Sequence, residues 1–192
     1  MSERETRDIC IVDAGPLITF AMGDGLKELT AAGNNYQFKI LDVVSVEAGR
    51  RGKPGGDEVA DWIEKMQGAG KLDVIETEVG KALCEGREKN PKFRIKNAGE
   101  NAIAEWLTNG GADAANRAVV IFEDDDTRKL LKGMSPDANI TAVTTRAFII
   151  DGEAAGYVKD AKATWDKIAV LAPTRTDVVE RFEVSQKKAA TP

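Results

Sequence analysis

The sequence predicts an α/β protein of the three-layer α/β/α kind, with a central parallel sheet of about five strands. Short apolar runs alternate along the chain with longer stretches of helical periodicity, a pattern typical of parallel sheets covered by helices. The runs at 9–12 and 118–122 are almost wholly apolar, as expected for strands that are buried on both faces. Each of these two runs is followed at once by acidic residues, which indicates that side chains of one chemical kind gather at the strand ends.

Five strands and the helices between them follow from this pattern. Pro16 marks the first helix, because proline suits the first helical position. Val59, Ile63 and Met66 share one face of a later helix, which follows the turn-forming segment Gly-Lys-Pro-Gly-Gly at 52–56. We expect strands at 9–12, 38–44, 72–75, 118–122 and 140–143, and helices at 16–30 (one helix or two), 57–67, 76–88, 99–107, 146–156, 159–171 and 174–186.

Length and composition indicate one soluble domain. The chain has 192 residues, of which 42% are hydrophobic and 31% are charged. We expect a single domain over 1–192, with additional C-terminal helices from about 158 and a flexible tail at 187–192. No apolar stretch approaches the roughly 18 residues that a membrane-spanning helix needs, so we expect no membrane association.

Cysteine usage and the polar N-terminus predict a cytoplasmic protein. Cys10 lies in the first expected strand and Cys84 in an expected helix, without a CxxC spacing, so both are expected to be buried thiols in a reducing compartment. The first eight residues are polar and mixed in charge, unlike a secretory signal peptide.

The chain contains no histidine, which excludes many mechanisms. Ser-His-Asp triads, Cys-His dyads and histidine-rich zinc or iron sites cannot form. The formal net charge of −5 argues against a protein that coats nucleic acid by electrostatics alone. It permits an enzyme whose acidic cleft is neutralised by metal ions.

Four acidic positions stand at the ends of expected elements. Asp13 follows the first strand, Glu47 follows the second, Glu100 opens a helix and Asp124 follows a later strand. Because parallel strands share one carboxyl edge, the fold would bring these side chains together. Two carboxylates about 4 Å apart repel by roughly 4 kcal/mol at an effective dielectric constant near 20. A bound cation removes this cost, and ligands that are all oxygen select Mg²⁺ or Mn²⁺.

The motifs around these acids resemble those of PIN-domain proteins, the nuclease fold of VapC-type toxins. The matching stretches are Ile-Val-Asp-Ala-Gly-Pro-Leu-Ile from residue 11, Val-Ser-Val-Glu from residue 44, Gly-Glu-Asn-Ala-Ile-Ala from residue 99, and the strand and acidic run from residue 119 to Arg128. The resemblance implies that the catalytic and metal-binding residues are Asp13, Glu47, Glu100 and Asp124, with Asp126 as a supporting ligand. The fourth ligand remains open between Asp124, Asp125 and Asp126. Ala14 departs from the family pattern, because many members carry a hydroxyl residue there.

The resemblance also implies an activity. We expect an Mg²⁺- or Mn²⁺-dependent endoribonuclease that hydrolyses RNA phosphodiesters, the toxin of a toxin–antitoxin pair, with an antitoxin protein as partner and a homodimer as its assembly. Arg94 and Lys96 lie in a basic run at 87–96, and Arg51 follows Glu47, so these three are candidate RNA contacts. Phe93 is a candidate for stacking on a base.

Other interpretations stay open. The same acids could have purely structural roles: Asp13 or Asp124 could cap a helix, and Glu100 could interact favourably with the helix dipole. The fold could also serve a nuclease of RNA processing or of DNA, or a catalytically decayed module that binds proteins. A phosphoryl-transfer protein with an aspartate nucleophile is a further alternative, although Asp13 lacks the usual Asp-x-Asp context.

Overall fold

A five-stranded sheet forms the centre of the protein, and all of its strands are parallel. The computed structural model describes residues 7–111, 117–124, 127, 129, 131 and 139–189, with only the backbone of 182 and 184–189. The strand order is β3-β2-β1-β4-β5, which confirms the predicted fold class. The strands are β1 (Asp8–Val12), β2 (Tyr36–Leu41), β3 (Leu72–Ile75), β4 (Ala118–Phe122) and β5 (Ile140–Thr144).

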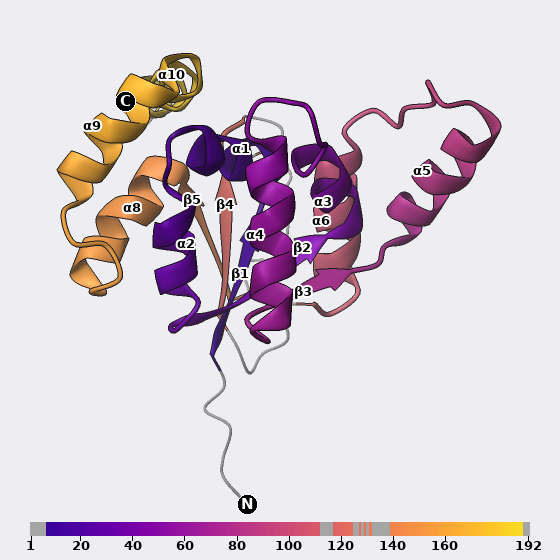
Figure 1. Ribbon diagram of the computed structural model, residues 1–192, viewed down its shortest axis with the longest axis horizontal. Coiled ribbons are helices and arrows are strands. Elements are labelled where there is room, and N and C mark those ends of the chain that lie inside the picture. The colour runs from indigo at the N-terminus through magenta and orange to yellow at the C-terminus, as the bar shows by residue number, and fades with distance from the viewer. Residues whose placement is uncertain are drawn as a thin grey trace, which may run out of the picture.

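Helices cover both faces of this sheet (Figure 1). In that view α4 lies over the near face, and α6 lies behind β2 and β3. The chain moves one way across the sheet from β1 to β3 and then returns past β1 to β4, through the crossover connections that parallel strands require. The helices are α1 (Ala14–Met22), α2 (Leu26–Ala32), α3 (Asp42–Ala48), α4 (Gly56–Gly68), α5 (Glu78–Lys89), α6 (Ala98–Thr108), α8 (Thr145–Ala154), α9 (Ala161–Leu171) and α10 (Pro173–Ala189).

The core lies on both sides of β1 and β4, two of the three inner strands of the sheet. Every residue of β4 is buried, as are Cys10, Ile11 and Val12 of β1, because helices cover both faces of these strands. Phe38 of β2 packs edge-to-face on Trp62 of α4 at a centroid distance of 5.7 Å. This core fixes the carboxyl ends of the strands, from which the predicted site residues emerge.

The second strand is shorter than the sequence suggests. We expect a strand to residue 44, but β2 ends at Leu41, and Val43 and Val44 belong to α3. The cause is Asp42, whose carboxylate accepts hydrogen bonds from the backbone N–H of Val43 (2.8 Å) and from the backbone N–H and hydroxyl of Thr77. The apolar run continues across this boundary because the first turn of α3 is itself buried.

Three further observations concern the ends of the chain and the cysteines. Cys10 is buried and burial raises its pKa, but Cys84 is exposed on α5, so the expectation of two buried thiols is wrong for Cys84.

The last helix, α10, extends to Ala189, into the segment that we expect to be a tail. None of the described helices is both long enough and apolar enough to cross a membrane.

Candidate acidic site

Asp13 joins β1 to α1 and is the centre of the candidate site. It occupies the position before α1 where an aspartate ordinarily caps the helix, yet its side chain makes no capping hydrogen bond. Its backbone N–H donates to the carbonyl oxygen of Ile121, 3.1 Å away, which ties the residue to β4. Only 8% of Asp13 is exposed, so a carboxyl group is buried here without the role that usually explains such an aspartate.

The pKa of Asp13 reports its surroundings. The pKa of its carboxyl group is raised from about 4 to about 7: burial is the largest cause, the negative charges of Asp124, Glu100 and Glu47 act in the same direction, and the backbone N–H of Ala14 acts against them. The predicted acids are therefore electrostatic neighbours, although they come from four separate connections of the fold. At the start of α6, a Cβ on Gly99 would stand 3.4 Å from Asp13 Oδ1, an ordinary contact distance, so this helix begins beside the Asp13 carboxyl group.

The other acids differ in exposure and in partners. Glu47 is exposed on α3, and Glu100 is half-buried in the first turn of α6. Asp124 follows β4 and accepts hydrogen bonds from the backbone N–H (2.7 Å) and hydroxyl (3.1 Å) of Thr127. Asp124 therefore makes the capping contacts that the structural interpretation expects. These contacts do not prevent its carboxylate from also binding a cation. Asp125, Asp126 and Arg128 lie outside the described residues.

The donor chemistry of this cluster fits a hard divalent cation, since all four side chains offer carboxylate oxygens. Within the described part of the chain, however, no three acidic or cysteine side chains are already arranged as a metal-binding group. Among the described residues, no basic side chain is a main influence on the charge of buried Asp13, so a cation would complement this carboxyl group.

A buried network beside the site was missed by the sequence analysis. Glu123 directly precedes Asp124, is 3% exposed, and accepts hydrogen bonds from Thr19 (3.0 Å) and Thr145 (2.5 Å). Arg175 of α10 pairs with Glu123 at 2.5 Å and also donates to Thr19 at 3.1 Å. Although burial raises the pKa of Glu123, these donors stabilise its charged form. The network anchors α10 to the same edge of the sheet as Asp13.

The three candidate RNA contacts lie in different settings. Arg94 and Lys96 are exposed in the connection between α5 and α6. This connection runs from the end of α5 back toward the sheet, where α6 begins (Figure 1). Arg51 lies near three carboxylates of α4, at 3.5 Å from Asp57, 3.0 Å from Asp61 and 3.6 Å from Glu64. A phosphate at Arg51 would have to compete with these carboxylates, whereas a phosphate at Arg94 or Lys96 would not.

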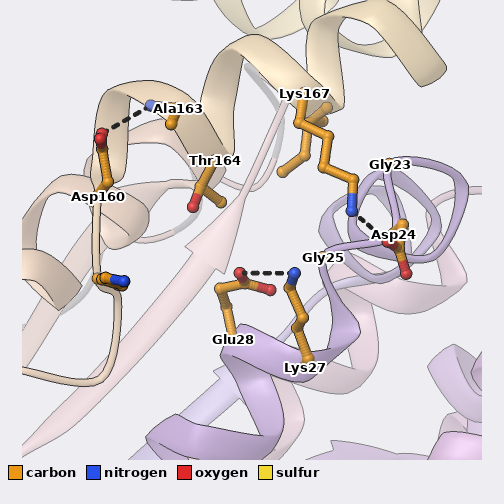
Figure 2. A pocket seen from close by; sticks show the side chains of 11 residues that line it. Gly23, Asp24, Gly25, Lys27, Glu28, Asp160, Ala163, Thr164 and Lys167 are labelled. Carbon is orange, nitrogen blue, oxygen red and sulfur yellow. Dashed lines mark hydrogen bonds and ion pairs between the residues drawn. The ribbon is translucent and has the colours of Figure 1, made fainter.

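A pocket of about 240 Å³ lies elsewhere, between the end of α1 and α9 (Figure 2). It contains none of the predicted site residues and adjoins the opposite end of α1 from Asp13. Its charges compensate one another: Lys167 pairs with Asp24, and Lys27 lies 3.9 Å from Glu28. Burial raises the pKa of Glu28, whose Oε2 has no hydrogen-bond partner among the described residues.

A comparison of the chain with protein-family models found no match, and neither did a comparison with curated proteins. The resemblance to PIN domains therefore depends on the order of the acidic motifs and on the positions of their residues.

Proposed function

We propose that this protein is an Mg²⁺- or Mn²⁺-dependent nuclease that hydrolyses RNA phosphodiesters. One observation carries the proposal: the Asp13 carboxyl group is buried, caps no helix, and has the charges of Asp124, Glu100 and Glu47 as neighbours. Burying an acid among other acids destabilises the fold unless a cation joins them. Buried acids with strongly raised pKa values are concentrated at functional sites, which supports a role of Asp13 in the reaction.

Each acid has a role in this proposal. Asp13 and Asp124 hold the cation directly, Glu47 and Glu100 hold it through water or complete a second site, and Asp126 supports them. The cation, when bound, lowers the pKa of an attacking water and offsets charge on the phosphodiester. The protein's own side chains fix the position of the cation at the carboxyl edge of the sheet. Arg94 and Lys96 approach the RNA backbone and offset the negative field of the acids.

The biological setting that we propose is a toxin–antitoxin pair. The small antitoxin would cover the acidic edge with a helix or an extended segment, and two copies of the chain would pair. Toxicity on expression, relieved by Asp13→Asn, would support this setting. A nontoxic but active enzyme would instead favour a nuclease of RNA processing or of DNA.

A non-enzymatic alternative has one observation in its favour. Because the described residues hold no preassembled metal-binding group, the fold could be a decayed module that binds proteins. Titration with Mn²⁺ separates the two, since only the nuclease requires the cation.

The test of the proposal is cleavage of a mixed-sequence RNA in Mn²⁺, in Mg²⁺ and in EDTA. We expect cleavage only with a cation, and its loss in Asp13→Asn and in Asp124→Asn. Asp151→Asn is the matched control, because Asp151 is an exposed aspartate on α8. Cleavage that persists in EDTA or in Asp13→Asn would overturn the proposed site. A folded wild type that neither cleaves RNA nor binds Mn²⁺ would favour the decayed module.

A further inference from the structure

Phe93 is an exposed aromatic residue whose position the core does not explain. Of the aromatic side chains that the structure describes, it is the one counted as exposed, with 37% of its surface accessible. It does not belong to the hydrophobic core or to the partly buried side chains packed against that core. About a third of the ring is therefore open to solvent, and the contacts that hold the rest of it are local ones.

A turn and a glycine hold the ring in place. Asn90 begins a turn in which its carbonyl accepts from the N–H of Phe93 (2.8 Å) and its side chain accepts from the N–H of Lys92 (3.0 Å). Pro91 stands at the second position of this turn, where its fixed φ is favourable. The turn folds Phe93 back onto Gly86 of α5. A Cβ on Gly86 would stand 2.7 Å from Phe93 Cγ and closer still to Cδ1 and Cε1, so only glycine lets the ring lie there.

Phe93 lies within a strongly basic run of the sequence. The run 87–96 contains five basic residues and one acidic residue, in a chain whose formal net charge is −5. All five basic side chains are exposed, and none forms an ion pair with a residue that the structure describes, in contrast to Arg51. The five are Arg87, Lys89, Lys92, Arg94 and Lys96. A polyanion with flat faces fits a surface that combines unpaired cations with a supported aromatic ring.

The location of the ring connects it to the acidic site. The segment from Phe93 leads directly into α6, where Gly99 lies against Asp13. Six residues of extended chain span at most about 20 Å, so a strand stacked on Phe93 lies within a few nucleotides of the acids.

We propose that Phe93, supported by Gly86, is a stacking platform that selects unpaired bases of an RNA single strand entering the acidic site. This inference rests on the proposed function for its choice of RNA. The cations of the run 87–96 hold the phosphates, and the ring holds one base. A duplex cannot use the platform, because its bases already stack on each other.

The test measures the affinity of a labelled single-stranded RNA and of a duplex of the same sequence, by fluorescence anisotropy. The full chain carries Asp13→Asn and the buffer contains EDTA, so that binding is read without cleavage. We expect Phe93→Ala to weaken single-strand binding by about tenfold or more, and Phe93→Trp to preserve it. Phe93→Leu, which keeps an apolar contact on Gly86 but no aromatic face, should resemble Phe93→Ala. Binding of the duplex should not change in any of these variants.

Gly86→Ala provides an independent test that separates the platform from stability. Alanine is a better helix former than glycine, but its Cβ would displace the ring, so affinity for the single strand should fall while the melting temperature does not. Wild-type affinity in Phe93→Leu, equal losses for the duplex, or no RNA binding by the parent protein would overturn the platform. Failure of cleavage in the nuclease test, with a Phe93-dependent affinity intact, would overturn the proposed enzyme instead.

Discussion

Asp13 makes the stability of the folded protein depend on pH. Its pKa is raised to about 7 in the fold, so between about pH 4 and pH 7 the folded state holds a proton that the unfolded state releases. The contribution of this group to stability is therefore present at low pH and is lost as the pH rises toward 7. The rise of the pKa from about 4 to about 7 corresponds to a contribution of roughly 4 kcal/mol at most.

This linkage gives the first prediction. In EDTA, the free energy of unfolding of the wild type should fall between about pH 4 and pH 7, whereas Asp13→Asn should lessen the fall and be more stable than the wild type above pH 7. Urea denaturation at several pH values measures this difference. Asp151→Asn, in which an exposed carboxylate is replaced, should keep the wild-type slope. An unchanged slope in Asp13→Asn would mean that Asp13 is not the buried acid of the fold.

The Arg175–Glu123 pair gives a second prediction at the scale of single residues. Arg175→Met would leave Glu123 buried without its positive partner, and this should cost about 3 kcal/mol or more. Arg51→Met removes an exposed arginine with its own carboxylate partners and should cost much less stability, because solvent screens ion pairs of this kind. Chemical denaturation of the two variants at pH 7 provides the comparison. Equal losses would contradict the structural importance of the buried pair.

At the scale of elements, local pattern predicts most of the fold. Apolar runs and turn residues place β1, β3 and β4 and the helix at Gly56–Gly68, because each signal lies within a few neighbouring residues. The end of β2 is missed because Val43 and Val44 continue an apolar run that a strand and a buried helix share. The network of Arg175 is missed for a different reason. Its partners Glu123 and Thr19 lie 52 and 156 positions away, and no local pattern reports such pairing.

The connection between α5 and α6 carries the third prediction. Arg94→Ala with Lys96→Ala should weaken RNA binding, and each lost phosphate contact should lower the salt dependence, with a slope of log K against log salt smaller by about 0.7. Arg51→Ala should have a smaller effect, because its guanidinium already faces three carboxylates. Affinity measured at several salt concentrations in EDTA distinguishes them. A larger loss in Arg51→Ala would move the RNA path toward α4.

At the scale of the whole molecule, the acidic site exists only as a consequence of the complete topology. Asp13 follows β1, Glu47 lies in the β2–β3 crossover, Glu100 in the β3–β4 crossover and Asp124 after β4, so all four acids meet only when the sheet is complete. The unfolded chain has no such site. A cation that binds these acids must therefore stabilise the folded state, in proportion to its concentration and affinity.

The last prediction follows from this coupling. At about pH 8, Mn²⁺ at a hundred times its dissociation constant should stabilise the wild type by about 2.7 kcal/mol. For a chain of this length, that corresponds to a rise of about 5–10 °C in melting temperature. The double variant Asp13→Asn, Asp124→Asn should show no rise, and Asp151→Asn should respond as the wild type does. Differential scanning fluorimetry across a Mn²⁺ titration measures the effect. A rise of equal size in the double variant would place the cation elsewhere and remove the acidic edge from the proposed chemistry.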